Sequence, residues 1–280
     1  RNIQEDYVNK DLLFLGTELG LYITINGGDR WSKFTKNVPP VAVHYIELQS
    51  QTNDLVMGTH GRGVIIIDDI SPLREINEDN LSNKLYFFER DQFEIQEFGG
   101  FSDSFGRETQ FFGANPSLSC EIQYLLPKRH TFGKMTMEIQ DMDGNKITTL
   151  NPGKSKGINT VNWSYNMRTP KIAKAKTLSF GGFTSPTVPA GDYKVVVKKG
   201  RDTFEKVINV AYKNNAGLSD DDRKFQFETV MKLFNMTEEL AYMVYVIDEL
   251  ISNENIDDQI SSKLNDLKKS LVITTGDNYV

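Results

Sequence analysis

A short pattern of apolar residues, a Gly-Thr pair, a glycine-bounded turn and a second apolar run occurs twice near the start of the chain. The first copy, Leu12 to Gly28, is LLFLGTELGLYITINGG, and the second, Asp54 to Asp69, is DLVMGTHGRGVIIIDD. The glycines of the two pairs, Gly16 and Gly58, are about 42 residues apart. A period of roughly 40 to 50 residues with several short strands per unit is typical of β-propeller blades. The pattern therefore predicts one or two propeller blades.

Short runs of apolar and β-branched residues, separated by turn residues, predict strands through residues 1–74. These runs cover 12–15, 20–25, 42–49, 54–58 and 64–68. A propeller of about 70 residues cannot close into a ring, because isolated blades leave exposed sheet edges. We therefore expect residues upstream of Arg1 to supply the remainder of the propeller, as the partner of this segment.

The stretch 75–116 differs in composition and is expected to link the first segment to a second domain. It begins with polar residues, becomes aromatic-rich over 85–98 and combines glycine with phenylalanine over 99–115. Flexible linkers lack such aromatic residues. We therefore expect a long ordered loop that lies over an apolar surface.

Alternating and apolar runs return at residue 117 and predict a β-sandwich over 117–213. Within it, Asp141 to Asn145 contains an Asp-Gly pair that predicts a hairpin turn. The runs cover 119–126, 134–140, 145–150, 157–165, 191–198 and 204–211.

The last part of the chain, 218–272, has the three-to-four residue spacing of apolar side chains that predicts helices. Ser219 is expected to cap the first helix, and the acidic residues 220–222 lie where the helix dipole favours negative charge. This helix should continue to about Ser252, and a second should cover 256–271. Two helices with a short break predict an antiparallel hairpin. The expected fold class is therefore mainly β with a C-terminal α-helical hairpin.

Composition adds limits on the class of protein. The chain has 280 residues with 39% hydrophobic content, which is enough for two or three domains with their own cores. Its net charge of −6 and the dispersal of its basic residues along the sequence argue against nucleic-acid binding. No apolar run reaches the ~18 residues that span a bilayer. The single cysteine, Cys120, excludes a disulfide within the chain and is expected to be a buried strand residue rather than a nucleophile.

The residues between the two copies, from Thr24 to Trp31, resemble the Asp-box S/T-x-D-x-G-x-x-W of sialidases, the sortilin family and BNR-repeat bacterial proteins, with Asn26 at the Asp position. In such a hairpin Asn26 can hydrogen-bond its own turn, Gly27 and Gly28 allow positive φ, and Trp31 folds back as an apolar plug. The second copy resembles the final G/A-T-H-G-R-G repeat of sortilin-like bacterial proteins. The resemblance implies that 1–74 is the last blade or blades of an Asp-box propeller. It also implies a secreted protein, located outside the cell, on its surface or in the periplasm.

Two sequences in the second domain resemble an Ig-like domain of the flagellar hook-capping type. They are Lys156 to Trp163, which contains G-x-N-x-V-x-W, and Val188 to Val195, which contains P-A-G-x-Y-x-V. The resemblance implies that Trp163 fills the core, that Gly191 sets a turn and that Tyr193 begins the returning strand.

His60 and Arg62, in the turn of the second copy, are the leading candidates for ligand binding. The glycines around them allow a sharp turn, and the two side chains could bind a carboxylate or an anionic sugar. Glu18 occupies the equivalent turn of the first copy and is a third candidate. The alternative is structural: Arg62 would pair with Asp68 or Asp69 and close the blade.

No pattern for a zinc site, a phosphate loop or a serine nucleophile occurs in the sequence. We therefore expect no catalytic residue, metal or cofactor in this chain. Asp141 and Asp143 beside Gly144 are too few for a calcium loop and favour a turn. The sequence thus favours a non-catalytic part of a secreted or surface-attached sortilin-like propeller protein that binds protein or glycan. Two alternatives remain: a glycoside hydrolase whose catalytic carboxylates lie upstream of residue 1, and a docking module that acts through the helical hairpin.

Overall fold

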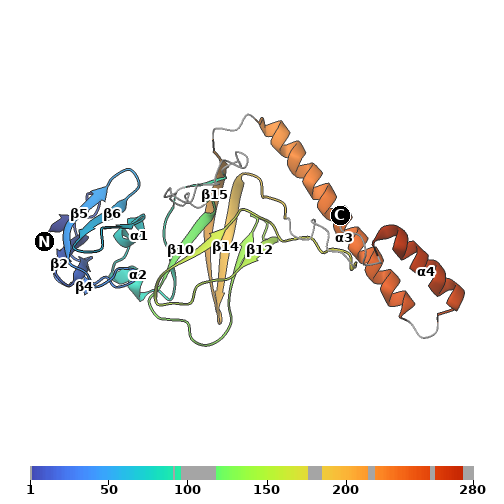
Figure 1. Ribbon diagram of the computed structural model, residues 1–280, viewed down its shortest axis with the longest axis horizontal. Coiled ribbons are helices and arrows are strands. Elements are labelled where there is room, and N and C mark those ends of the chain that lie inside the picture. The colour runs from blue at the N-terminus through green and yellow to red at the C-terminus, as the bar shows by residue number, and fades with distance from the viewer. Residues whose placement is uncertain are drawn as a thin grey trace. The chain divides into compact units, whose positions relative to one another are not determined.

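The computed structural model describes residues 2–90, 92–95, 118–175, 185–213, 218–252 and 256–273. This part of the chain is mainly β with several sheets and a C-terminal pair of helices, which confirms the expected class (Figure 1). The loop predicted over 99–115 lies outside the described residues, and the predicted domain boundaries remain predictions. The chain divides into two compact units. Unit 1 comprises Arg1–Glu89, Ile122–Gly133 and Gly153–Thr160, and unit 2 comprises Arg90–Glu121, Lys134–Pro152 and Val161–Val280.

Unit 1 contains two antiparallel sheets in which the repeated pattern forms the same hairpin twice. In the first hairpin Gly16 pairs with Leu21, and in the second Gly58 pairs with Val64. The first sheet has the strand order β1-β2-β3-β4 and the second the order β5-β6-β7. Their bounds are β1 Ile3–Glu5, β2 Leu13–Thr17, β3 Gly20–Thr24, β4 Ser32–Lys33, β5 Val43–Gln49, β6 Asp54–Thr59 and β7 Val64–Ile67.

The turn that follows β3 is held by side-chain hydrogen bonds. The Thr24 hydroxyl donates to Asn26 Oδ1 at 2.8 Å and accepts from the Gly28 N–H at 3.1 Å. Asn26 Oδ1 also accepts from the Arg30 N–H at 3.0 Å, and both central glycines have positive φ. Trp31 folds back over Gly28 and is half-buried, so its ring is covered only in part.

The core of unit 1 is apolar, with one charged pair at its border. Leu12, which precedes β2, Phe14 and Leu21 of the first sheet, and Ile46 and Met57 of the second are among its fully buried side chains. The border pair joins Asp6, after β1, to Arg74 at the end of the short helix α1 (Ser71–Arg74). A second short helix, α2 (Glu78–Ser82), begins at Asn77, whose side chain accepts from the Asn80 N–H.

Two further sheets contain the remaining strands. Their orders are β13-β10-β8 and β12-β11-β14-β15-β9. Two of these strands lie within the aromatic-rich part of 75–116: β8 pairs antiparallel with β10, and β9 pairs parallel with β15. The bounds are β8 Tyr86–Phe87, β9 Phe93–Ile95, β10 Cys120–Leu126, β11 Met135–Gln140, β12 Lys146–Leu150, β13 Gly157–Trp163, β14 Gly191–Lys199 and β15 Asp202–Tyr212.

Aromatic side chains form the centre of the core of unit 2. Trp163 is 2% exposed, and its indole N–H donates to the Asn166 carbonyl at 2.9 Å. The rings of Tyr165 and Tyr193 each lie 5.6 Å from the Trp163 ring. Tyr193 follows Gly191, the first residue of β14, and its hydroxyl donates to the Pro189 carbonyl at 2.6 Å.

The helical pair consists of α3 (Asp220–Ile251) and α4 (Asp258–Leu271). Ser219 and Asp222 form a reciprocal cap at the start of α3, as expected for a serine followed three residues later by an acidic side chain. Val244 and Ile247 are buried, and Lys268 of α4 pairs with Asp248 of α3. Within the described residues, no helix combines the length and the hydrophobicity that crossing a membrane requires.

The basic residues are less dispersed than the sequence suggests. Two loops of unit 1 lie side by side, because the His130 N–H donates to the Lys154 carbonyl at 3.0 Å. They carry exposed cations that are distant in the sequence: Lys128, Arg129, Lys154 and Lys156. Basic residues that are dispersed along the sequence therefore lie close together in this part of the surface, because the strand connections bring separate segments together.

Candidate functional site

The three candidates from the sequence occupy hairpin turns at one end of unit 1. Glu18 lies in the turn between β2 and β3, and His60 and Arg62 lie in the turn between β6 and β7. Both turns are near the start of β5, because Val43 pairs with Thr59 and a Cβ on Gly16 would lie 2.7 Å from the Val43 carbonyl oxygen. All three candidate side chains are exposed. The structure therefore places them at one end of the unit without enclosing them in a pocket.

A second histidine, His44, accompanies His60. The ring of His44, on β5, stacks on the ring of His60 with centroids 5.6 Å apart and an angle of 24° between the planes. The His60 N–H donates to the Ala42 carbonyl at 2.9 Å and fixes the turn beside β5. No sequence pattern indicated this pair, because the two histidines are brought together by strand pairing rather than by spacing.

Arg62 does not make the predicted closing ion pair. In the described part of the chain, neither Asp68 nor Asp69 forms a salt bridge with it. Asp69 Oδ1 instead accepts from the Ser71 N–H and hydroxyl, and the Asp69 N–H donates to Asp54 Oδ1 at 3.0 Å. The carboxylate of Asp69 thus binds Ser71, the first residue of α1.

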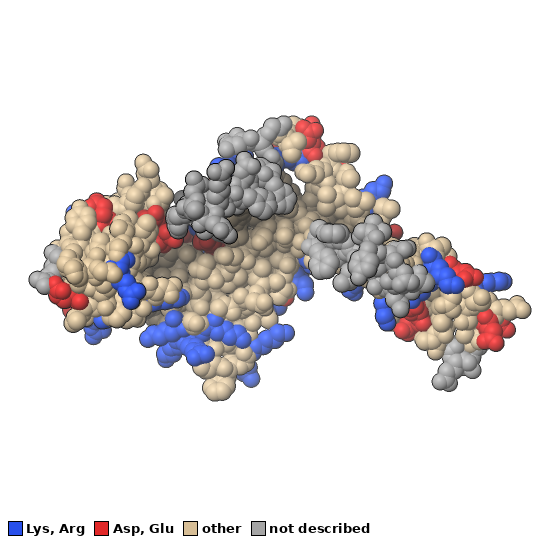
Figure 2. Space-filling model, in the orientation of Figure 1, with Lys and Arg blue, Asp and Glu red and all other residues tan. Residues whose placement is uncertain are grey.

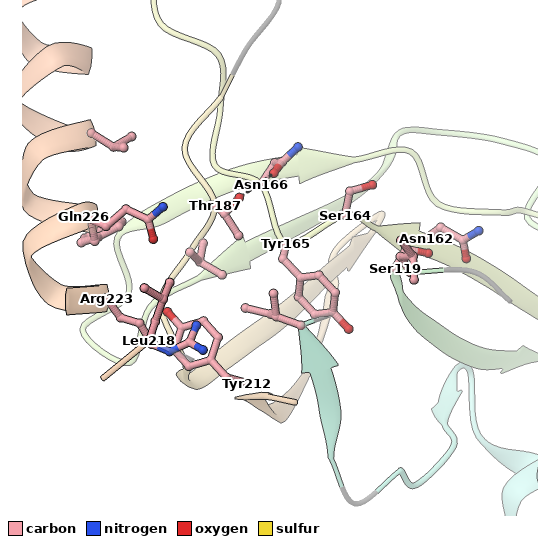
Figure 3. Close-up of a pocket in the computed structure, with 15 residues that line it drawn as sticks. Ser119, Asn162, Ser164, Tyr165, Asn166, Thr187, Tyr212, Leu218, Arg223 and Gln226 are labelled. Atoms are coloured by element: carbon pink, nitrogen blue, oxygen red, sulfur yellow. Dashed lines mark hydrogen bonds between the residues drawn. The ribbon is translucent and has the colours of Figure 1, made fainter. Parts of the chain in front are cut away.

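A more enclosed site is present in unit 2, as a pocket of about 930 Å³ (Figure 3). Arg223 and Gln226 of α3 lie on one side, Ser119 and Asn162 lie on the opposite side, and Tyr165 lies between them. The lining also includes Ile95, Leu118, Ser164, Asn166, Thr187, Val188, Tyr212, Leu218, Phe227 and Val230.

Alternation along β13 places polar groups at the pocket. Val161, Trp163 and Tyr165 point into the core, so Asn162 and Ser164 face outward. Both outward side chains are exposed, and neither forms a hydrogen bond to another described residue. Their amide and hydroxyl groups are therefore available to a ligand.

The segment after β13 is fixed by backbone pairing. The Val188 N–H donates to the Tyr165 carbonyl and the Met167 N–H donates to the Pro186 carbonyl, each at 2.8 Å. Between these bonds Asn166 pairs with Thr187, and both contribute to the lining. This wall of the pocket is therefore set by main-chain geometry.

Tyr165 is a buried aromatic residue at the pocket, and both its backbone and its hydroxyl are held in place. Its backbone has φ of 58°, and its hydroxyl donates to the Glu94 carbonyl at 3.2 Å. Burial raises the pKa of Tyr165 to about 12, so the phenol remains protonated over the physiological range. Because Tyr165 is 4% exposed, its role in the site is to support the wall of the pocket, not to exchange protons.

The α3 wall contributes the only charged side chain among the described lining residues. The Arg223 guanidinium lies over the Tyr212 ring, with Cζ 3.8 Å from the ring centroid. This stacking holds the arginine against the end of β15. One turn further along α3, the exposed amide of Gln226 lines the same pocket (Figure 3).

The chemistry of this lining suits binding. Asparagine, glutamine, serine, threonine and tyrosine supply donors and acceptors, and the described lining residues include no carboxylate, imidazole or thiol. Cys120 is buried away from solvent, and burial raises its thiol pKa to about 12. No group of three or more His, Cys, Asp or Glu side chains that could hold a metal occurs within the residues that the structure describes.

This pocket could not be predicted from the sequence, because its walls come from segments that are far apart in the chain. Asn162 and Ser164 could have been identified as outward-facing positions of a predicted strand, but no pattern indicated that α3 would lie beside them. Comparison with known proteins adds no assignment, since no protein-family model, curated protein or solved structure matches the chain.

Proposed function

We propose that this chain is a non-catalytic, ligand-binding part of a secreted or surface-attached protein, and that the pocket of unit 2 binds a glycan. The observation that carries the proposal is the lining: amides and hydroxyls arranged around aromatic rings, with a single charged side chain among the described lining residues. A site with this composition can hold a polar ligand, and its described lining residues include no carboxylate or imidazole that could act as a general acid or base.

Glycans match this lining because a sugar hydroxyl both donates and accepts hydrogen bonds. Side-chain amides such as those of Asn162 and Gln226 also offer both roles, so each can bind a pair of neighbouring hydroxyls. The half-buried ring of Phe227 offers apolar surface to the C–H groups of a sugar. The volume of about 930 Å³ is near the upper end for small-ligand sites and favours an oligosaccharide over a single sugar.

For unit 1 we propose the closing portion of a sortilin-like, Asp-box propeller. The repeated hairpin and the Thr24–Asn26 turn support this assignment. So does β7, the outermost strand of its sheet in the described chain, where Val64 and Ile66 are 66% and 55% exposed. Apolar strand edges are normally covered, and the rest of such a propeller would supply the cover.

For unit 2 the buried Trp163 and the Gly191–Tyr193 strand start support an Ig-like sandwich. The proposed location outside the cytoplasm rests on the family resemblance alone.

The pocket is tested by binding to an oligosaccharide array, followed by calorimetry with the tightest ligand. Asn162→Ala and Gln226→Ala should each weaken binding by about fivefold to tenfold, the equivalent of a lost hydrogen bond. Asn235→Ala is the matched control, because Asn235 is an exposed amide on the same helix that does not line the pocket. Loss of binding in His60→Ala or Arg62→Ala, with both pocket variants unaffected, would move the site to the turns of unit 1.

A second candidate function is protein docking through the helical pair. Phe225, Met236, Met243 and Leu250 are 72%, 53%, 52% and 46% exposed, and their spacing places them along one side of α3. A partner helix could cover this stripe. The test is affinity capture with the full chain and with Met236→Ser/Met243→Ser, using Tyr242→Ser as the control. A partner retained equally by all three proteins would count against the stripe.

A further inference from the structure

The loop that connects β10 to β11 carries a highly exposed aromatic side chain next to positively charged residues. Phe132 in this loop is 89% exposed. Lys128 and Arg129 precede it and are also exposed. Exposure of a phenylalanine ring to water is unfavourable, and burial of the ring in an apolar layer would recover that free energy.

A second loop adds to the charge. The hydrogen bond from the His130 N–H to the Lys154 carbonyl joins the two loops and brings Lys154 and Lys156 beside the first pair of cations. Neither 127–133 nor 152–157 contains Asp or Glu, although the chain as a whole has a net charge of −6. Figure 2 shows Lys and Arg side chains gathered along the lower edge of the view. In the part of the chain that the structure describes, Lys128, Arg129, Lys154 and Lys156 form no salt bridge.

The second loop is held by buried groups. The Tyr124 hydroxyl donates to the Gly153 carbonyl at 2.6 Å. The side chain of Asn159, which is 7% exposed, donates to the Ser155 carbonyl at 2.8 Å and accepts from the Ser155 N–H at 3.1 Å. The space beside Gly153 is filled, because a Cβ there would lie 2.5 Å from Asn159 Oδ1. These hydrogen bonds and this packing therefore fix the conformation of the backbone that carries Lys154 and Lys156.

The first loop also has a defined turn. Gly133 has φ of 88°, which glycine adopts without strain, and its carbonyl lies 3.2 Å from the His130 ring nitrogen Nε2. This turn leaves Phe132 pointing away from the body of the unit, as its exposure shows.

We propose that these two loops dock the protein on an anionic lipid surface. Phe132 enters the interfacial region of the bilayer, and Lys128, Arg129, Lys154 and Lys156 contact the negatively charged headgroups. Aromatic side chains are favoured at the membrane–water interface, and each nearby cation adds attraction to anionic lipid. The contact is peripheral and does not involve the pocket of unit 2.

The aromatic residue decides between a lipid surface and a soluble polyanion. A soluble polyanion would bind the cations alone and would gain little from Phe132. A lipid surface uses both groups, because it offers headgroup charge and an apolar layer that removes the ring from water. The presence of Phe132 among the cations therefore favours lipid.

The experiment measures co-sedimentation of the full chain with vesicles of phosphatidylcholine alone and of equal parts phosphatidylcholine and phosphatidylglycerol. Binding should require phosphatidylglycerol and weaken at high salt. Lys128→Glu/Arg129→Glu should lower the affinity by at least about tenfold, since each cation contributes roughly fivefold. Phe132→Ser should also lower it by about tenfold. Phe225→Ser, which changes another exposed phenylalanine on α3, should leave binding unchanged.

Heparin, a soluble polyanion, provides the second arm. The proposal predicts that Phe132→Ser impairs vesicle binding while heparin binding, if present, is unaffected. In addition, Phe132→Trp should show a blue-shifted fluorescence change on anionic vesicles that brominated lipids quench. Absence of vesicle binding would overturn the proposal, and so would vesicle binding that depends on the cations but not on Phe132. Circular dichroism of each variant checks that the fold is retained.

Discussion

Glu238, on α3, accepts hydrogen bonds from the Arg168 guanidinium at 2.8 Å and from the Lys171 N–H at 2.9 Å. Arg168 also lies over the Phe234 ring, with Cζ 4.8 Å from its centroid. Because Arg168 follows the segment that forms one wall of the pocket, these contacts link that wall to the helix opposite. The pocket in unit 2 therefore depends on an interaction outside its own lining.

Glu238→Gln should lower the free energy of unfolding of unit 2 by about 0.5 to 1 kcal/mol. The value is small because the two side chains are 49% and 25% exposed, which leaves the pair screened by solvent. Urea denaturation measures the change. Glu239→Gln, an exposed carboxylate next to it on α3, should have a smaller effect, and equal effects would contradict the assigned role of Glu238.

The carboxylate of Glu238 should also make the free energy of unfolding of unit 2 depend on pH. Hydrogen bonds from Arg168, and then from the Lys171 backbone, lower the pKa of Glu238 from 4.5 to about 2. A lowered folded-state pKa adds stability above the unfolded-state pKa, and this contribution is lost as the pH falls toward the folded value. The stability difference between wild type and Glu238→Gln should therefore be constant above pH 4.5 and shrink between pH 4.5 and 2. A difference that grows with acidity would refute this account.

Unit 1 should depend strongly on the pair formed by Asp6 and Arg74. Arg74 donates to both carboxylate oxygens of Asp6 at 2.9 Å, and the Asp6 side chain is fully buried. Arg74→Ala would leave this carboxylate without its cation, at a cost of about 3 to 5 kcal/mol. Hydrogen exchange of the β1–β7 amides should show the loss of protection. Arg62→Ala, which removes an exposed arginine, should change stability by less than about 0.5 kcal/mol.

The two tryptophans should differ in accessibility. Trp163 is 2% exposed and Trp31 is half-buried, so acrylamide should quench mainly the Trp31 emission. Trp163→Ala should destabilise unit 2 by about 3 to 5 kcal/mol, because it removes a large core side chain. Trp31→Ala should lower the free energy of unfolding by less than Trp163→Ala does. Comparable quenching in the two single-tryptophan proteins would contradict the placement of Trp163.

Local chemistry explains why parts of the fold could be predicted. The Ser219–Asp222 cap, the Asp141–Asn145 turn and the repeated hairpins depend on residues that are neighbours in sequence. In the turn, the Asn145 N–H donates to Asp141 Oδ1 at 2.8 Å, and Gly144 has φ of 89°. Such features need no knowledge of distant segments.

The features that could not be predicted are those that distant segments create together. The stacking of His44 on His60 and the basic loops around Lys128 and Lys154 arise only when strands place separate turns side by side. The pocket has the same origin, because Asn162 and Gln226 are brought together by the position of α3. Trp31 differs from these features. Its turn forms as the local sequence predicts, but the turn supplies too little surface to bury the ring.

The central claim is that the unit 2 pocket binds glycan through its amide groups. The most direct test is a ¹H–¹⁵N NMR titration that follows the side-chain amides of Asn162 and Gln226 while the best oligosaccharide from the array is added. The account predicts saturable shifts of both amides, with the Asn235 amide unchanged. Binding that leaves Asn162 and Gln226 unmoved, while the backbone amides of His60 and Arg62 shift, would contradict it.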